Sequence, residues 1–216
     1  MERIVENIGI LGSGRVAAVL ANKLAGAGHA IAIGTRDPAQ AASKWSGARV
    51  EHTEHAGAAR RAAIVINATP GDTSVERLGA LRDELKGKIL IDVSNATVRG
   101  QNGLPSGQLY PGGSVAERLQ DALPETAVVK TLNTMLFTVM ADPGSLRIPP
   151  TAFLSGNDES AKAVVARLLG DLGWPADWIE DLGDITTARG TEALVLLVPS
   201  VVRKRGLVPF ALTLAR

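Results

Sequence analysis

Short apolar runs alternate along most of the chain with segments that have helical spacing. Runs that are apolar throughout, without alternating polar positions, are typical of strands buried on both faces of a parallel sheet. The regular alternation of strand and helix predicts an α/β, doubly wound (Rossmann) fold with a mostly parallel sheet and the strand order 3-2-1-4-5-6. We expect the six strands at residues 8–11, 30–34, 48–51, 62–68, 88–93 and 127–132.

The C-terminal part is expected to extend this sheet with extra strands and a C-terminal helix. Residues 152–156 and 176–180 are expected strands, and Asn157 is expected to cap a helix over 158–172. A last helix begins near Asp184 and ends around residues 203–206. Because it is apolar nearly all round, we expect it to be buried, in a dimer interface. We predict a nucleotide-binding Rossmann domain at residues 1–150 and an extension of the same domain at 151–216.

Residues 97–113 contain five glycines, two prolines and the chain's only tyrosine, without hydrophobic periodicity. A loop of this length inside a compact domain is usually a lid, a binding loop or a disordered segment. Two capping boxes, Thr73-x-x-Glu76 and Ser114-x-x-Glu117, are expected to begin the helices on either side of the fifth strand.

Composition narrows the chemistry. The 216 residues contain no cysteine, which excludes disulfides, thiolate nucleophiles, iron–sulfur clusters and cysteine zinc sites. Any redox chemistry must therefore belong to a bound cofactor. A net charge of +1 and 3% aromatic residues give little for nucleic acid to bind, so we expect no nucleic-acid partner.

No targeting or membrane segment is expected. Glycines and Arg15 interrupt the first apolar run, unlike a signal peptide. The most apolar late segment, residues 193–202, contains Pro199 and spans about half the length that a membrane helix needs. We expect a cytoplasmic protein without a membrane partner.

The first expected strand ends in Gly12-Ser13-Gly14-Arg15-Val16-Ala17 and leads into a helix. This G-x-G-x-x-A pattern is a dinucleotide-binding fingerprint when strand and helix flank it. The first glycine permits the sharp turn, the second lets a pyrophosphate approach the backbone, and the alanine keeps helix and strand close. The phosphates would lie on free N–H groups at the positive end of the helix. We predict that residues 12–16 bind the cofactor.

The turn after the second strand reads Gly34-Thr35-Arg36. An NAD site usually has an Asp or Glu about twenty residues past the glycines, where it binds the ribose 2′-hydroxyl. A hydroxyl and a guanidinium would instead bind a 2′-phosphate, so Thr35 and Arg36 predict NADP as the cofactor. Asp37-Pro38 follows as an N-cap and first helical residue, which anchors the turn. The alternative is that Arg36 is a solvated surface arginine.

Small or polar residues end the other strands. Ligands of a doubly wound sheet bind at the carboxyl ends of its strands, so we predict cofactor contacts from Ala68, Thr69, Pro70, Ser94, Asn95 and Asn133. No histidine, lysine or carboxylate is expected among these strand ends, and we predict no catalytic side chain. Hydride exchange between two redox cofactors needs mainly alignment of their rings, which positioning can supply. The alternative is that these side chains only satisfy backbone groups.

The remaining candidate groups are expected to be structural. His52 and His55 have H-x-x-H spacing, which is not the H-E-x-x-H pattern of a helical metal site, so we expect a solvated turn and no metal. His29 is expected in a structural turn. Asp92 lies inside an apolar strand and is expected to be a buried, hydrogen-bonded carboxylate.

Taken together, these motifs resemble the reductases that pass hydride between NADP and the deazaflavin coenzyme F420. The resemblance rests on residues 8–14, 33–36, 92–95, 114–117, 129–134, 155–159 and 181–183. It implies a doubly wound domain with extra strands, a homodimer, and NADP with the deazaflavin as second redox cofactor. By resemblance the NADP site is lined by Ser13, Arg15, Thr35, Arg36, Ala68, Asn95 and Asn133, with the nicotinamide near the two asparagines and the deazaflavin stacked on it.

The expected function is thus direct hydride transfer between NADP(H) and a deazaflavin. The chain has Asn133-Thr134 where the deazaflavin enzymes have a His-Thr-like pair, so two alternatives stay open. One is an NADPH-dependent reductase of another small-molecule acceptor, such as a flavin, quinone or imine. The other is a module that binds NADPH without turnover. The basic cluster Arg203-Lys204-Arg205 could bind the anionic tail of a deazaflavin or only complement a helix dipole.

Overall fold

The computed structural model describes residues 5–101 and 103–215 and has an eight-stranded sheet in the order β10-β9-β8-β5-β4-β1-β2-β3. Neighbouring strands are parallel except β8 and β9, which are antiparallel. The predicted order of the first six sheet strands is confirmed, as is the extension by two more. The strands are β1 (Asn7–Leu11), β2 (Ala30–Gly34), β3 (Glu51–Thr53), β4 (Ile64–Asn67), β5 (Ile89–Asp92), β8 (Ala127–Lys130), β9 (Ala152–Gly156) and β10 (Ile179–Asp181).

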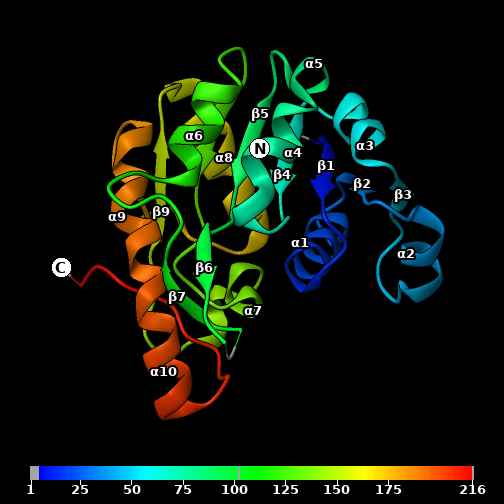
Figure 1. The fold of residues 1–216 in the computed structure, drawn as a ribbon. Helices are drawn as coiled ribbons and strands as arrows, with labels where there is room; N and C mark the ends of the chain where they lie inside the picture. The colour runs from blue at the N-terminus through cyan, green and yellow to red at the C-terminus, as the bar shows by residue number, and fades with distance from the viewer. Residues whose placement is uncertain (1–4, 102, 216) are drawn as a thin grey trace.

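Helices cover both faces of the sheet (Figure 1). On one face, α1 (Arg15–Gly26) and α8 (Glu159–Leu172) pack on one core cluster, which includes Leu20 and Val165. On the other face, α3 (His55–Arg61), α4 (Ser74–Gly79), α5 (Arg82–Leu85) and α6 (Val115–Ala122) form a second cluster, which includes Leu78 and Leu119. Strand β4 contributes Ile64 and Ile66 to the first cluster and Val65 to the second, as a strand buried on both faces must.

The register brings the carboxyl ends of five strands to one edge of the sheet. Leu11, the last residue of β1, pairs with Gly34 of β2 and with Asn67 of β4. Asn67 pairs with Asp92 of β5, which in turn pairs with Lys130 of β8. The segments that follow these residues therefore leave the sheet side by side, and they contain all the predicted cofactor-binding residues.

The expected turn at His52 and His55 and the expected capping box at Thr73 both differ from the observed structure. Strand β3 begins at Glu51, later than expected, so His52 lies in a strand and His55 is the first residue of α3, not part of a solvated turn. The predicted Thr73 capping box is wrong. A 3-10 turn, Gly71–Thr73, precedes α4, and the Thr73 hydroxyl donates back to the Pro70 carbonyl at 3.5 Å.

The other predicted caps can also be checked. Ser114 begins α6 as expected, because its Oγ accepts from the Glu117 N–H at 3.1 Å. Asp37 caps α2 (Pro38–Lys44) by accepting from the Gln40 N–H at 2.9 Å. The cap of α8 is Asp158, not Asn157, whose Oδ1 accepts from the Ile185 N–H at 3.0 Å instead.

Residues 97–113 are not an irregular loop throughout. They contain an antiparallel pair, β6 (Thr97–Arg99) and β7 (Pro105–Gln108), with a register shift between Val98 and Arg99. The sequence did not indicate this hairpin, because its strands are only three and four residues long and four glycines lie outside them in the same segment. Strand propensity is a weak signal over such short runs. In Figure 1 the pair lies at the carboxyl edge of the main sheet, near α7 (Phe137–Met140) and α10 (Val198–Arg205).

The C-terminal helical segment, Ile185–Arg205, is only partly buried by its own chain, so its expected burial in a dimer interface stays a prediction. It runs through the 3-10 turn Ile185–Thr187, α9 (Ala188–Ala193), the 3-10 turn Leu194–Leu197 and α10, and 28% of its most apolar window is buried. Its 21 residues are long and apolar enough to cross a membrane by length and composition, so the expectation of too short a segment was wrong. Pro199 does not break it, because it lies in the first turn of α10, where its missing N–H costs little.

The chain after this helix returns to the carboxyl edge of the sheet. The Leu136 N–H donates to the Phe210 carbonyl at 2.9 Å, and the Leu212 N–H donates to the Thr134 carbonyl at 3.2 Å. Between these bonds, Met135 and Ala211 form an isolated antiparallel bridge. The C-terminal tail therefore borders the segment that follows β8.

Candidate functional site

The glycine turn after β1 is tightly packed at its first glycine. Gly12 has a φ of +114°, and its N–H donates to the Gly34 carbonyl at 2.8 Å. A Cβ at this position would lie 2.7 Å from the Ala68 carbonyl oxygen. Both the backbone angle and the neighbouring strand therefore require glycine here.

The second glycine faces open space. A Cβ on Gly14, the N-cap of α1, would meet no atom of residues 5–101 or 103–215 within 4 Å, so packing within this part of the chain does not require a glycine there. Among the residues that the structure describes, no side chain caps α1, and the first turn of this helix contains no acidic residue. The first N–H groups of a helix have no intrahelical partner and carry a partial positive charge, so this end of α1 suits a phosphate.

Arg15 stands beside this helix end. The side chain is exposed, and its guanidinium carbon lies 4.9 Å from the centre of the Phe137 ring at the start of α7. The ring supports the guanidinium through a cation–π contact. Arg15 thus links the glycine turn to the segment after β8.

The turn after β2 is fixed on both sides. The hydroxyls of Thr35 and Ser13 lie 3.2 Å apart, and the Thr35 N–H donates to the Thr53 carbonyl of β3 at 2.9 Å. Thr35 is buried, whereas Arg36 is exposed. The Asp37 carboxylate caps α2, and Arg36 gives this turn an exposed cationic side chain.

A cavity of about 570 Å³ joins the two turns. Five of the predicted residues line it: Ser13, Gly14, Arg15, Thr35 and Arg36. Sequence reasoning missed Trp45 and His52, which also line the cavity and whose rings meet edge to face at 5.5 Å. Burial lowers the pKa of His52, which favours the neutral imidazole. An aromatic residue shortly after the arginine of this turn was the available signal.

Gly12 and Val16 belong to the glycine turn but do not line this cavity. The other predicted residues lie farther along the same edge, outside its lining. Asn95 and Asn133 form a reciprocal pair, in which Asn133 Nδ2 donates to Asn95 Oδ1 at 3.0 Å and Asn95 Nδ2 donates to the Asn133 carbonyl at 2.9 Å. Leu132, just before this asparagine, has a φ of +58°, unusual for a residue with a Cβ. The pair therefore holds together the segments that follow β5 and β8.

The segment after β4 is held from inside the sheet. Thr69 is buried and its hydroxyl donates to Asn67 Oδ1 at 2.7 Å, while the Ala68 N–H donates to the Leu11 carbonyl at 2.9 Å. Pro70 is exposed. The Thr69 hydroxyl is thus hydrogen-bonded inside the protein, whereas Pro70 faces the solvent.

A buried ionic cluster lies beneath these segments, and sequence reasoning missed it. Asp92 and Lys130, the last residues of β5 and β8, form an ion pair at 2.8 Å, and Glu192 of α9 reaches the same ammonium at 2.9 Å. Both strands end earlier than expected, β5 by one residue and β8 by two, so a carboxylate and a lysine directly precede the predicted polar segments. Asp92 is buried and hydrogen-bonded as predicted. A charged residue at the end of each of two adjacent apolar strands was the available signal.

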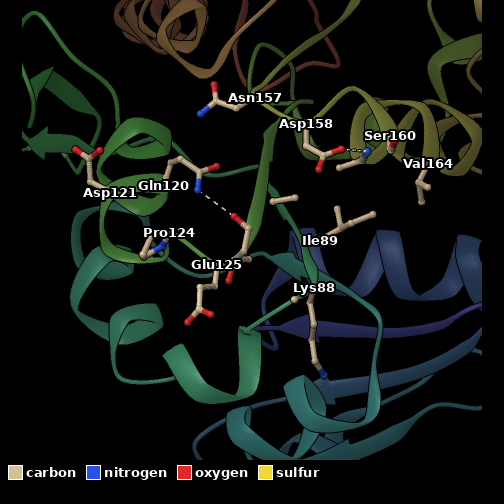
Figure 2. A pocket seen from close by; sticks show the side chains of 14 residues that line it. Lys88, Ile89, Gln120, Asp121, Pro124, Glu125, Asn157, Asp158, Ser160 and Val164 are labelled. Carbon is tan, nitrogen blue, oxygen red and sulfur yellow. Dashed lines mark hydrogen bonds between the residues drawn. The ribbon is translucent and has the colours of Figure 1, made fainter.

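A larger cavity lies at the opposite edge of the sheet. It measures about 830 Å³ and is lined by the first residues of β5 and β8 together with the start of α8 (Figure 2). The side chain of Gln120, on the wall of this cavity, is hydrogen-bonded to the protein backbone. Its Nε2 donates to the Thr126 carbonyl at 3.0 Å, and its Oε1 accepts from the Val128 N–H at 3.2 Å. Size alone therefore does not identify the cofactor site, which belongs at the carboxyl ends of the strands.

The residues at the carboxyl edge fit NADP. The open space at Gly14, the uncapped α1 and the cavity with its arginines give a cradle for phosphates on a βαβ unit. The turn after β2 offers a hydroxyl and a guanidinium where an NAD site usually has a carboxylate.

Comparison with known proteins agrees with this geometry. Residues 7–96 match the family described as "NADP oxidoreductase coenzyme F420-dependent". The chain is 30% identical over 148 residues to the F420-dependent NADP reductase of Methanocaldococcus jannaschii. This alignment covers 67% of this chain and 64% of that protein. It is 32% identical over 198 residues to the metalloreductase STEAP3 of Rattus norvegicus, covering 89% of this chain and 37% of that protein. The chain thus spans less than two thirds of either relative.

A solved structure matches the chain along its whole length. It is that of a candidate F420-dependent NADP reductase from Arthrobacter sp. FB24, which is 38% identical, superposes with a TM-score of 0.90, and covers 98% of this chain and 100% of its own. The family therefore implies NADP and coenzyme F420 as redox cofactors. This chain belongs to the family of coenzyme F420-dependent NADP oxidoreductases.

Proposed function

We propose that the protein transfers a hydride directly between NADP(H) and a deazaflavin cofactor whose ring stacks on the nicotinamide. One observation carries the proposal: a basic turn, an uncapped helix N-terminus and a pair of carboxamides follow one another along the carboxyl edge of the sheet. They match the 2′-phosphate, the pyrophosphate and the nicotinamide of NADP in order. Family membership supports the same cofactor pair.

The adenosine half of NADP would occupy the cavity between the glycine turn and α2. Arg36 would bind the 2′-phosphate, with the Thr35 and Ser13 hydroxyls beside it. Charge-assisted hydrogen bonds to a phosphate contribute roughly 1.5–3 kcal/mol each, which is enough to select NADP over NAD. The rings of Trp45 and His52 offer the adenine a partly apolar wall.

The pyrophosphate would lie against the N-terminus of α1. Gly12 shapes the turn, Gly14 leaves room for the phosphates, and the N–H groups that follow, including that of Val16, point toward them. Arg15, supported by Phe137, would close this part of the site from the side of α7.

The nicotinamide would lie beside Asn95 and Asn133, bordered by Ser94 and by residues 68–70. Each asparagine amide keeps a second N–H beyond the one in the reciprocal pair, and a carboxamide is the natural partner of the carboxamide of nicotinamide. The strained backbone of Leu132 supports a functional role for this segment, since such strain collects at binding sites.

Catalysis would rest on alignment. When bound, NADPH and an oxidised deazaflavin exchange a hydride, and the accompanying proton comes from water. Asp92 and Lys130 lie near this place but are buried and paired with each other, so they do not serve as an acid and a base. The other residues proposed here bind and orient the rings, which supplies a large part of the rate.

A second candidate is an NADPH-dependent reductase of a different acceptor. The similarity to a metalloreductase over 89% of this chain, together with Asn133-Thr134 at the end of the sixth sheet strand, favours keeping it. The NADP site would be the same, and only the group beside the nicotinamide would differ.

The test is anaerobic mixing of the protein with NADPH and, in separate reactions, a deazaflavin, a flavin, a quinone, an imine and a ferric chelate. Loss of the nicotinamide absorbance with the deazaflavin supports the proposal. Turnover only with another acceptor selects the second candidate. Tight NADPH binding without any turnover would instead indicate a binding module and overturn both.

We also propose that the protein is a cytoplasmic homodimer whose second copy covers the C-terminal helical segment. Leu196 and Leu197 on this segment are 43% and 49% exposed, and contact with a second copy would bury this apolar surface. In this proposal residues 151–216 serve as an extension of the nucleotide-binding domain, residues 1–150, and carry the dimer contact. Light scattering should give twice the chain mass, and Leu197→Asp should give monomers. A monomeric wild type, or partition of the wild type into vesicles, would contradict it.

A further inference from the structure

Lys130 is fully engaged inside the protein. Its ammonium group contacts Asp92 Oδ2 at 2.8 Å and Glu192 Oε1 at 2.9 Å, and it donates a third hydrogen bond to the Ser94 carbonyl. The side chain is 1% exposed. Burial alone would lower the pKa of Lys130, but the charges and hydrogen bonds of the two carboxylates outweigh it and raise the pKa, so the lysine stays charged.

Glu192 connects this lysine to a different part of the molecule. It belongs to α9, and its Oε2 and Oε1 accept from the N–H groups of Val115 and Ala116 at 2.9 and 3.2 Å, 77 and 76 residues away along the chain. These groups open α6, so the carboxylate lies at the positive end of a helix as well as on the lysine. One C-terminal side chain therefore bridges α9, α6 and β8.

The same cluster holds the segment after β5. The Ser94 N–H and hydroxyl donate to Asp92 Oδ1 at 3.2 and 2.8 Å, while the Ser94 carbonyl accepts from Lys130. Ser94 is thus held from its amide, its side chain and its carbonyl. The next residue is Asn95, which pairs with Asn133, three residues after Lys130. Asn95 therefore directly follows a residue that the cluster holds, and Asn133 lies three residues after another.

We infer that Glu192 is a positioning residue, through which the C-terminal helix fixes Lys130 and, with it, the Asn95–Asn133 pair against the nicotinamide. This inference rests on the proposed function. The adenosine half of NADP, at the other end of the site, should not depend on Glu192, because residues of the glycine turn and α2 line that cavity.

The experiment compares Glu192→Gln with Arg189→Ala. Glutamine has nearly the same volume as glutamate and keeps one side-chain oxygen that can accept a hydrogen bond from α6. It lacks the negative charge and the second oxygen, so it cannot also accept from Lys130 and the other N–H group of α6. Arg189→Ala removes an exposed ion pair between the same helices, in which Arg189 Nε lies 2.9 Å from Glu117, and it leaves the buried cluster intact. Single-turnover reduction of a deazaflavin by NADPH gives the hydride-transfer rate. Affinities for NADPH and for 2′-phospho-ADP-ribose, which lacks the nicotinamide, separate the two halves of the site.

Glu192→Gln should lower the hydride-transfer rate by about tenfold or more, since small misplacements of reacting groups are costly. It should also weaken NADPH more than 2′-phospho-ADP-ribose, whereas Arg189→Ala should change neither measurement by more than about twofold. Equal behaviour of the two variants would overturn the inference. If Glu192→Gln does not fold, Glu192→Asp carries the same test. If the wild type binds NADPH but does not reduce the deazaflavin, the proposed function fails, and the ratio of the two affinities still tests the role of Glu192.

Discussion

The hydroxyl groups of Ser13 and Thr35 lie 3.2 Å apart, although 22 residues separate them along the chain. One belongs to the glycine turn after β1, and the other to the turn after β2 that carries Arg36. This contact fixes the distance between the helix end that suits the pyrophosphate and the cation that suits a 2′-phosphate. In the proposed site, this contact holds the two short motifs together so that they would bind one dinucleotide.

Replacement of Arg36 by alanine should weaken NADPH by about ten- to a hundredfold and leave NADH nearly unchanged, because only NADPH carries the 2′-phosphate. Equilibrium binding of both nucleotides to wild type and variant measures this. Arg49, on the surface before β3 and absent from the cavity lining, gives a matched control in Arg49→Ala. Equal losses for NADPH and NADH would sink the assignment of Arg36.

The two glycines of the first turn should respond differently to alanine. Gly12→Ala should lower the free energy of unfolding by about 1–3 kcal/mol, because its φ is +114° and the new Cβ would meet the Ala68 carbonyl. Gly14→Ala should lower it by no more than about 1 kcal/mol, the usual cost of alanine at an N-cap, yet weaken NADPH, because its Cβ would stand where the phosphates bind. Urea unfolding and NADPH titration separate the two effects. A folded Gly14→Ala variant with full NADPH affinity would place the phosphates elsewhere.

Lys130→Met should destabilise the protein by about 3–5 kcal/mol, because it leaves the carboxylates of Asp92 and Glu192 buried without their cation. The control is Lys86→Met. Lys86 pairs with Glu125 at 2.7 Å on the surface, and loss of such an exposed pair costs about 1 kcal/mol or less. Denaturant unfolding gives the free energy of unfolding of both variants. A similar decrease in the two would mean that the buried cluster stabilises the protein no more than a surface pair does.

Acid should weaken the contact between α6 and α9. The hydrogen bond from Arg189, above all, lowers the pKa of Glu117 below its usual 4.5. A lowered folded-state pKa stabilises the protein above the pKa of the unfolded chain, and this contribution is lost as the pH falls through the folded-state value. Wild type should therefore lose more stability than Arg189→Ala between neutral pH and about pH 3, by up to about 1 kcal/mol. Identical pH profiles of unfolding would show that the pair contributes nothing.

Much of the fold follows from local signals. The apolar runs at Ile64–Asn67 and Ile89–Asp92 could be read as central strands because both faces of each are buried. The hairpin of β6 and β7 could not, because three- and four-residue strands among glycines carry almost no pattern. How much of Ile185–Arg205 its own chain covers could not be predicted either, because the apolar composition of a helix does not show whether its own chain or a second copy buries it.

The site divides in the same way. The glycine turn and Thr35-Arg36 could be predicted because each is a contiguous motif with one physical meaning. The pairing of Asn95 with Asn133 depends on which strands are neighbours, which the predicted strand order supplied. Glu192 could not be found, because it reaches Lys130 from a helix whose place in the fold no local pattern determines.

Direct transfer between stacked rings is the central claim, and isotopic labelling tests it most directly. NADPH that carries deuterium at the transferable position of its ring, prepared separately for each face, should be mixed anaerobically with the protein and an oxidised deazaflavin. The account predicts that deuterium from one face appears on the reduced deazaflavin and not in water. Release of the label to water, or no reduction of the deazaflavin by a protein that binds NADPH, would contradict it.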